Sequence, residues 1–228
     1  MKHLGKILLI AGIAILALFI IWTVLIQTVD VKEVGQNGTS VGFSTLNVWF
    51  HKLTGLHMGT YSLTDWLGLV PIAVCLVFAA VGFVQMIKRK NPFKVDIDII
   101  LLGVYYALVI VAYLVFEMIP INYRPVLIDG RLEASYPSST TLLVLSVMPT
   151  LIFEAERRVK NAKIRLAIDI FAVAFSAFMV VGRTVSGVHW LTDIIGAVLL
   201  SAGLYLTYRA SVLLAEERRN KKAESAQE

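Results

Sequence analysis

Long runs of apolar residues alternate with short polar and charged segments along this chain of 228 residues. A helix needs about 20 predominantly apolar residues to cross the hydrocarbon core of a bilayer. Six segments come near that length, at about residues 7–26, 66–86, 99–116, 138–153, 166–182 and 189–208. The fourth and fifth are long enough only when their polar ends lie among the headgroups. The pattern therefore predicts an all-α fold, a bundle of six transmembrane helices.

The composition agrees with a membrane protein built as one domain. Hydrophobic residues make up 57% of the chain and charged residues 16%, whereas a soluble domain is about half apolar and about a quarter charged. No internal repeat is visible, so residues 1–228 are interpreted as a single integral membrane domain. The one cysteine, Cys75, lies inside the second apolar block and has no partner for a disulfide within the chain.

The first apolar block follows a short basic segment and in this respect resembles a secretory signal sequence. It is longer than a usual signal core, and no clear small-residue cleavage site follows it. We therefore expect this block to remain in place as the first span.

The distribution of Lys and Arg predicts how the bundle faces, because cytoplasmic loops carry an excess of these residues. With the amino terminus inside and six alternating spans, only five of the 21 lie outside: Lys32, Lys52, Arg124, Arg131 and Arg183. We predict a multi-pass protein of the cell membrane with both termini in the cytoplasm. The pI near 9.3 then reflects contact with anionic headgroups, and no nucleic-acid partner is expected.

Three polar segments from distant parts of the sequence fall at the outer ends of the predicted spans. They read EMIPINYRPV at 117–126, YPSSTT at 136–141 and GRTVSGVHWLTD at 182–193. Charged residues at the edge of a bilayer are costly unless they are paired or functional. Since the topology places all three segments at one membrane surface, we expect an active site at the outer face. Part of the longer outer segment, around residues 41–55, is expected to lie as an interfacial helix.

The side chains of these segments suit the binding and transfer of a phosphoryl group. His189 and Asp193 are four residues apart, which places them on one face of a helix. A carboxylate there can orient the imidazole and leave its other nitrogen nucleophilic. The guanidinium groups of Arg124 and Arg183 can each donate two parallel hydrogen bonds to phosphate oxygens. The hydroxyls at Ser138 and beyond are expected to cap a helix and to line an oxyanion site.

One of these segments carries a spacing found in a known family, the type 2 phosphatidic acid phosphatases, which are six-span membrane enzymes. The third motif of that family is Ser-Arg, five residues, His, three residues, Asp. Here Arg183, His189 and Asp193 keep that spacing, and Gly182 stands at the position of the serine. The resemblance covers most of the chain, from about the second predicted span to the sixth.

The other two family motifs are matched in part. The first is Lys, six residues, then Arg-Pro; this chain keeps Arg124-Pro125 and has Glu117 at the lysine position. The second is Pro-Ser-Gly-His; residues 137–140 read Pro-Ser-Ser-Thr, so Thr140 stands at the histidine position.

The resemblance implies a membrane lipid phosphatase that forms a phosphohistidine. His189 would attack phosphorus, Asp193 would orient the attacking ring, and water would then hydrolyse the intermediate. The phosphate would lie in a cradle made by Arg124, Arg183, Ser138 and the backbone amide of Ser139. The substrate is a phosphorylated lipid of the bilayer. No cofactor is implied, and no group of residues with metal-ligand spacing is visible beyond the His189 and Asp193 pair.

The two substituted motif positions bear on the leaving group. A hydroxyl such as that of Thr140 is too weak an acid to replace a histidine, whose general acid catalysis is typically worth about 10²–10⁴-fold. A phosphate leaving group needs a proton less than an alkoxide does, so we favour a polyprenyl diphosphate, such as undecaprenyl diphosphate, over phosphatidate. Glu117 either donates the proton itself or forms an ion pair with Arg124, and His51 and His57 are further candidate donors.

Three functions are therefore considered from the sequence. The first is an outward-facing phosphatase or diphosphatase of membrane lipids. The second is a catalytically weak or silent relative that binds or transports a phosphorylated lipid, which the residues at positions 117 and 140 would suit. The third is an unrelated small transporter or scaffold, which would require that Arg124, Arg183 and His189 do not meet.

Overall fold

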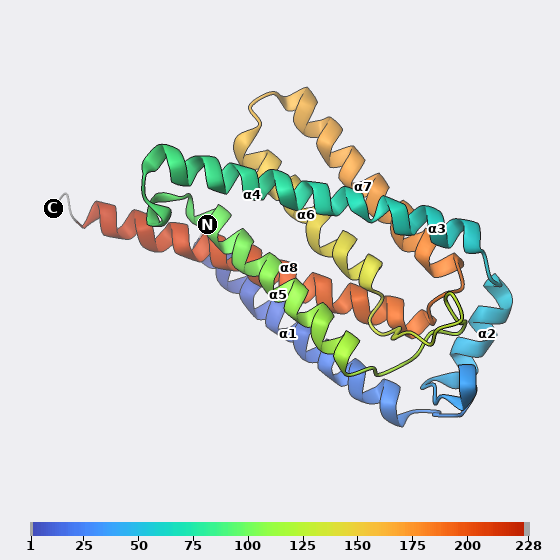
Figure 1. Ribbon diagram of the computed structural model, residues 1–228. Coiled ribbons are helices and arrows are strands. Elements are labelled where there is room, and N and C mark those ends of the chain that lie inside the picture. Colours follow the sequence, from blue (N-terminus) through green and yellow to red (C-terminus); the bar gives the residue numbers. More distant parts are fainter. Residues whose placement is uncertain (1, 226–228) are drawn as a thin grey trace.

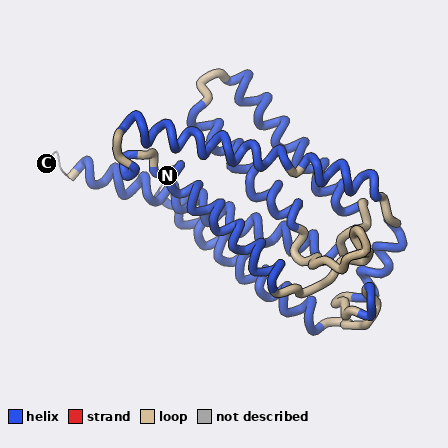
Figure 2. The backbone as a smooth tube through the Cα atoms, in the orientation of Figure 1, coloured by secondary structure: helices blue, strands red, loops and turns tan. Residues whose placement is uncertain are grey.

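The computed structural model of the chain describes residues 2–225, which form a bundle of α-helices (Figures 1 and 2). The helices are α1 (Lys2–Thr28), α2 (Ser44–Thr54), α3 (Met58–Leu67), α4 (Leu69–Arg89), α5 (Ile97–Met118), α6 (Ser139–Arg158), α7 (Ala162–Val185) and α8 (Leu191–Glu224). Short 3-10 turns lie at Gln36–Gly38 and Pro92–Lys94. Residues 2–225 form no strand beyond isolated bridges. The predicted all-α fold is confirmed.

Six helical segments are long and apolar enough to cross a membrane, as the sequence predicted. They are His3–Thr28, Met58–Arg89, Ile97–Met118, Ser139–Arg158, Ala162–Val185 and Leu191–Lys221. The second is made of α3 and α4, which meet at Gly68. Most of the helices are longer than the predicted apolar blocks, because helical hydrogen bonding continues through polar ends that a hydropathy pattern does not include.

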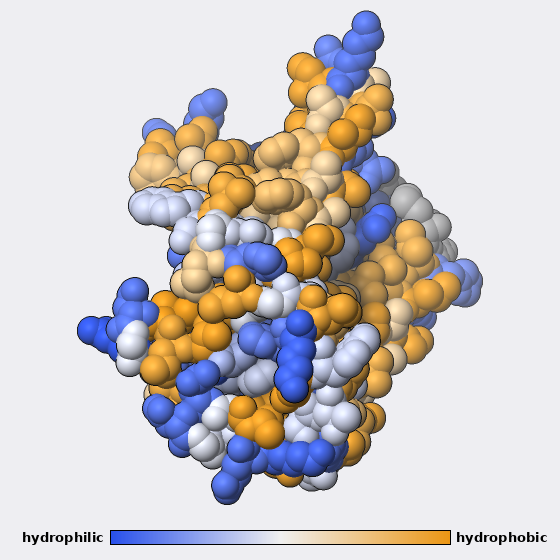
Figure 3. Space-filling view, turned by 90° about the vertical axis from the view of Figure 1, so that its right-hand side faces the viewer, coloured by the Kyte–Doolittle hydropathy of each residue, from blue (hydrophilic) through white to orange (hydrophobic). Residues whose placement is uncertain are grey.

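The surface of the bundle agrees with a protein that is surrounded by lipid. Large apolar side chains are exposed along α1, α4, α5 and α7, and Ile10 of α1 is 68% exposed. Figure 3 looks onto the end of the bundle that lies at the right of Figure 1, and polar residues gather there among apolar ones. Helix α2 forms within the segment expected to contain an interfacial helix, and its position at the membrane surface stays a prediction.

Helices α1 and α8 pack side by side. The first turn of α1 and the last turn of α8 lie at the same end of the bundle (Figure 1). Small residues allow the two backbones to approach. A Cβ atom at Gly203 would lie 2.7 Å from Cγ of Leu16, and one at Gly12 would lie 2.6 Å from Oγ1 of Thr207. Close contact at small residues is a usual way for transmembrane helices to associate.

A charged network joins α5, α6 and α8 near the end that carries the chain termini. Arg157 Nε and Arg158 Nη2 donate to Oδ2 of Asp98 over 3.1 and 2.8 Å. The carboxylate of Glu154, which is fully buried, accepts from Tyr208 Oη over 2.6 Å and also from Arg158. Because these charges are paired and hydrogen-bonded, they can be buried between helices.

The contact at Gly203 predicts a specific loss of stability. Gly203→Leu should lower the free energy of unfolding by about 1–3 kcal/mol, because the added atoms overpack the contact between α1 and α8. Thermal unfolding of the purified protein in detergent measures the effect. Gly103→Leu on α5 is the matched control, since a Cβ atom there meets nothing within 4 Å. Equal unfolding temperatures for the two variants would contradict this packing.

Candidate active site

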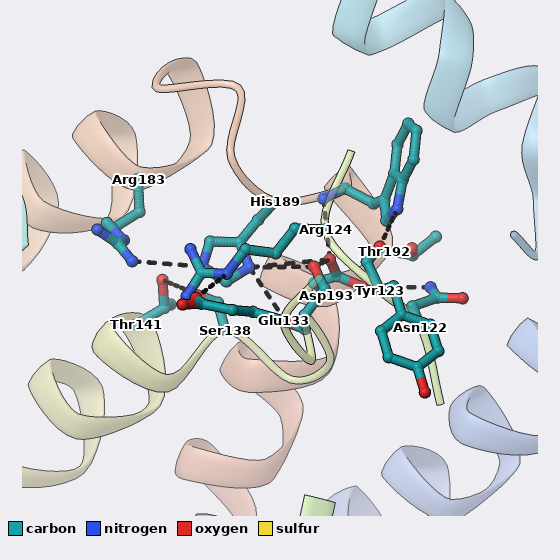
Figure 4. A network of polar contacts seen from close by, with 12 residues as sticks. Asn122, Tyr123, Arg124, Glu133, Ser138, Thr141, Arg183, His189, Thr192 and Asp193 are labelled. Atoms are coloured by element: carbon teal, nitrogen blue, oxygen red, sulfur yellow. Dashed lines mark hydrogen bonds and ion pairs between the residues drawn. The ribbon is translucent and has the colours of Figure 1, made fainter. Parts of the chain in front are cut away.

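Two connections and the start of a helix meet at the end of the bundle opposite the chain termini: the α5–α6 connection, the α7–α8 connection and the start of α6 (Figures 1 and 4). The α5–α6 connection folds back on itself at Asp129-Gly130. The φ angles of these two residues are 48° and 73°, and the hydrogen bonds between Ile128 and Arg131 measure 2.8 and 3.1 Å. Two positive φ angles match the type I′ turn that Asp-Gly favours.

This hairpin-like loop holds Arg124 opposite Glu133. The Arg124 amide donates to the Glu133 carbonyl over 3.1 Å, and the Ser135 amide donates to the Asn122 carbonyl over 2.9 Å. Trp190 Nε1 donates to the Tyr123 carbonyl over 2.8 Å, which fixes the loop to the start of α8. The backbone therefore brings the polar residues of the α5–α6 connection to the α7–α8 connection.

His189 lies at the centre of the site and is almost fully buried. Its Nδ1 is 3.1 Å from the Ser135 carbonyl oxygen. A carbonyl can only accept, so this contact requires the proton on Nδ1 and leaves a lone pair on Nε2. Nε2 points toward Nη2 of Arg183, at 3.4 Å (Figure 4).

The charge around His189 favours its neutral form. Burial, followed by the positive charges of Arg124 and Arg183, holds the pKa of the His189 imidazole well below its ordinary value. A lowered pKa means that the ring is uncharged at neutral pH and carries only the proton on Nδ1. The lone pair on Nε2 is then available for attack on an electrophile.

Asp193 lies near His189, as the spacing in the sequence predicts, but its shortest contacts are with other groups. Its Oδ2 is 3.9 Å from Nδ1 of His189. The carboxylate accepts from the Trp190 amide over 2.9 Å, which caps α8, and from Asn122 Nδ2 over 3.3 Å. It also accepts from the Ser135 hydroxyl, whose oxygen is 3.3 Å from Nδ1 of His189. Asp193 thus reaches the imidazole largely through Ser135.

The two arginines predicted to bind phosphate come together against one aromatic ring. The guanidinium carbons of Arg124 and Arg183 lie 5.8 and 4.8 Å from the ring centroid of Tyr61 on α3. Both arginines are buried, and Nη1 of Arg124 and Nε of Arg183 have no hydrogen-bond partner within the described residues. Buried donors of this kind are costly unless a ligand accepts from them.

Each arginine also faces a carboxylate. Arg124 Nε is 3.1 Å from Oε2 of Glu133. Arg183 Nη1 is 3.6 Å from Oδ1 of Asp65. The ion pair considered from the sequence between Arg124 and Glu117 does not form, because Glu133 occupies that place from the other side of the hairpin. Glu117 is instead exposed and lines the cavity beside the site.

Two adjacent cavities open at this end of the bundle. The first, of about 250 Å³, is lined by Arg124, His189, Glu117, Glu133 and Ser139, among others. The second, of about 280 Å³, lies between α4, α5 and α6 and is mostly apolar. The cavities share the wall residues Tyr113, Ser139 and Leu142 and therefore lie side by side.

The hydroxyl cluster at the start of α6 divides between the two cavities. Ser139 lines both, whereas Thr140 lines only the apolar cavity, with Asp65 on its wall. Ser138 is buried, and its hydroxyl donates to Oγ1 of Thr141 over 3.0 Å (Figure 4). The prediction that the Ser138 hydroxyl caps the helix is wrong, because that hydroxyl bonds to a side chain and not to a first-turn amide.

The two histidines considered as further proton donors are bonded elsewhere. His51 Nε2 is 3.0 Å from the Gly187 carbonyl, and His57 Nε2 is 2.8 Å from the Thr54 carbonyl. Neither residue lines the two cavities at the site. In residues 2–225 there is also no group of three His, Cys, Asp or Glu side chains placed to hold a metal ion.

Several residues of the site were missed from the sequence. Glu133 and Ser135 could have been placed near Arg124, because Asp129-Gly130 is a strong hairpin signal that folds residues 131–135 back along residues 122–128. A strict two-residue turn would put residue 135 opposite residue 124, so the observed pairing of residues 124 and 133, shifted by two positions, was not predictable. Tyr61 and Asp65 carry no such signal. Their approach depends on how α3 packs against α7, which is a contact between distant segments.

Fold and site together define a six-span membrane protein with two buried arginines beside a neutral histidine. A profile of the PAP2 superfamily matches residues 74–215. The match covers more than half of the chain, and the chain belongs to the PAP2 superfamily. This membership supports a membrane lipid phosphatase of the phosphatidic acid phosphatase kind.

One solved structure found to be similar is the crystal structure of a transmembrane PAP2-type phosphatidylglycerolphosphate phosphatase from Bacillus subtilis. The TM-score is 0.61 at 16% sequence identity, and the alignment covers 90% of this chain and 96% of that chain. At this identity the similarity shows a shared fold. The comparison with curated proteins gives no match.

The position of Tyr61 predicts a role in holding the two arginines. Tyr61→Leu should lower kcat/KM for a lipid phosphate by about 2–30-fold, because a cation–π contact is worth about 0.5–2 kcal/mol. Inhibition by orthovanadate, a phosphate analogue, should weaken in parallel. Tyr61→Phe keeps the ring and should stay near the native value. If the Phe variant loses as much as the Leu variant, the ring does not organise the arginines.

Proposed function

We propose that this protein hydrolyses a phosphorylated membrane lipid through a phosphohistidine on His189. The observation that carries the proposal is the placement of the imidazole: Nδ1 is bound to the Ser135 carbonyl, and Nε2 faces Arg183. A nucleophile whose lone pair points at a guanidinium donor is placed where a phosphoryl oxygen would also bind.

In the first step, Nε2 attacks phosphorus and the bond from phosphorus to the leaving oxygen breaks. The phosphate oxygens take over the guanidinium donor that Nε2 occupies at rest, which frees the lone pair for attack. The ring becomes positively charged as the N–P bond forms. The Ser135 carbonyl and, through the Ser135 hydroxyl, the Asp193 carboxylate then stabilise the proton on Nδ1.

In the second step, water attacks the phosphohistidine, and inorganic phosphate leaves with Nε2 restored. The charge on the transferred group is stabilised by Arg124 and Arg183, whose free buried donors suit a planar array of oxygens. The amide of Ser139, in the first turn of α6, is a further donor. Ser138 supports this turn, since its own amide donates to the Asp193 carbonyl over 3.2 Å.

The leaving group is proposed to be a phosphate carried by a polyprenyl chain. Thr140 supplies no acid, and its side chain faces the apolar cavity, which suits contact with a lipid tail. Glu117 remains the candidate proton donor on the polar cavity, because it lines that wall and Arg124 is paired with Glu133. A diphosphate bond requires the least assistance from such a donor.

A second candidate function is a relative of low activity that binds or moves a phosphorylated lipid. The observation that favours it is the pairing of both arginines, Arg124 with Glu133 and Arg183 with Asp65. These carboxylates compete with a phosphate for the guanidinium groups and would weaken a catalytic site.

The site is proposed to face the outside of the cell membrane, with both termini in the cytoplasm. The distribution of Lys and Arg supports this orientation. The basic runs at 88–94 and 157–165 lie in the α4–α5 and α6–α7 connections and in the helix turns next to them, whereas the site is formed by the α5–α6 and α7–α8 connections.

A substrate panel tests the proposed chemistry. The native protein should release phosphate from undecaprenyl diphosphate at least about ten-fold faster than from phosphatidate, because Thr140 supplies no proton to a poor leaving group. Thr140→His should raise turnover of phosphatidate more than turnover of the diphosphate. Phosphate release is measured with purified protein in mixed micelles.

His189→Ala is the control for this panel and should abolish release from both lipids. Equal native rates on the two substrates would contradict the proposed preference. Retention of activity in His189→Ala would contradict the mechanism itself. Binding of either lipid without any phosphate release by the native protein would favour the second candidate function.

A further inference from the structure

A second charged feature lies at the opposite end of the bundle from the active site. An open cleft of about 990 Å³ separates the α4–α5 connection from the last turns of α8. Its basic lining residues are Arg89, Lys94, Arg218, Arg219 and Lys221, and one acidic residue, Asp96, also lines it. Figure 1 shows the α4–α5 connection beside the terminal part of α8.

The basic groups of this cleft are only partly neutralised by the protein. Asp96 is already bound by Arg89 over 2.7 Å and by Gln85 over 2.8 Å. Within residues 2–225, Lys94, Arg218 and Arg219 form no ion pair. Three exposed, unpaired cations around one cleft produce a local positive potential that attracts an anion.

The cleft lies at the depth of lipid headgroups. Ala215, on its wall, is about 36 Å along α8 from Leu191 at 1.5 Å per residue. A bilayer is about 30 Å thick across its hydrocarbon and about 40–45 Å with its headgroup regions. With the active site at one surface, the cleft therefore falls in the headgroup region of the other surface.

Apolar residues continue the cleft toward the hydrocarbon. Phe93 is 89% exposed, and Ile100, one helical turn along α5 from Ile97, is 36% exposed. Both line the cleft together with the basic side chains. A surface that is basic at one edge and apolar at the other matches a molecule with an anionic headgroup and acyl chains.

We propose that this cleft binds an anionic phospholipid of the cytoplasmic leaflet. Lys94, Arg218 and Arg219 hold the phosphate of the headgroup, and the acyl chains lie along Ile97 and Ile100. Arginine suits this task because its guanidinium donates two parallel hydrogen bonds to phosphate oxygens. The bound lipid joins the α4–α5 connection to α8. This site is separate from the substrate cavity and does not depend on the proposed catalysis.

Lipid retention and thermal stability test the proposal. Purified protein is placed in micelles with either phosphatidylglycerol or phosphatidylcholine, and bound lipid is counted by native mass spectrometry. The native protein should retain phosphatidylglycerol and unfold at a higher temperature in its presence. The triple variant Lys94→Gln, Arg218→Gln and Arg219→Gln should bind it about 100-fold more weakly, given the contribution of each basic side chain near anionic lipid.

A matched triple variant separates a defined site from general attraction between charges. Lys160→Gln, Lys163→Gln and Arg165→Gln remove the same charge from the α6–α7 connection and the start of α7, outside the cleft. This control should keep the native retention and the native thermal shift. Equal losses in both triple variants, or full retention by the cleft variant, would overturn the proposal.

If the cleft triple variant does not fold, the single variant Lys94→Gln tests the proposed lipid site. Lys94 is exposed and lies outside the helices that form the bundle, so its replacement leaves the packing intact. It should lower phosphatidylglycerol retention about five-fold, which is the contribution of one basic group near anionic lipid. Unchanged retention in this folded variant would contradict the assignment of Lys94 to the headgroup.

Discussion

The burial of two guanidinium groups beside one neutral histidine is the constraint on which the site depends. Arg124 and Arg183 repel each other, and burial reduces the screening of that repulsion. The Tyr61 ring, Glu133 and Asp65 each offset part of the cost. Burial, together with this positive charge, lowers the pKa of His189 and keeps its ring neutral. One electrostatic arrangement would therefore supply both the anion site and the nucleophile of the proposed mechanism.

The bundle holds this arrangement at one end through connections that are bonded to helix ends. Asp193 caps α8 and also reaches His189 through Ser135, so the start of the helix and the position of the imidazole are set together. The opposite end carries the network around Asp98 and the basic cleft. In the proposed account, the polar end carries the chemistry and the basic end contacts lipid headgroups.

The sequence predicted the parts of the structure that depend on local pattern. The six spans followed from apolar blocks, and the spacing of Arg183, His189 and Asp193 brought those residues together as expected. Contacts between distant segments were not predictable. Tyr61 reaches the arginines only because α3 packs on α7, and the Glu133 pair with Arg124 depends on a shifted register that the Asp129-Gly130 turn alone does not give. Helix ends were missed because polar residues continue the helices.

Trapping the covalent intermediate tests the central claim most directly. The protein is mixed with a lipid diphosphate or monophosphate for a single turnover, quenched in base, which preserves phosphohistidine, and digested for mass spectrometry. The account predicts a phosphoryl group on the peptide that contains His189. The variant Asp193→Asn should carry none, because Asp193 supports the positively charged ring in this account. A phosphoryl group on another residue, or release of phosphate with no labelled peptide, would contradict it.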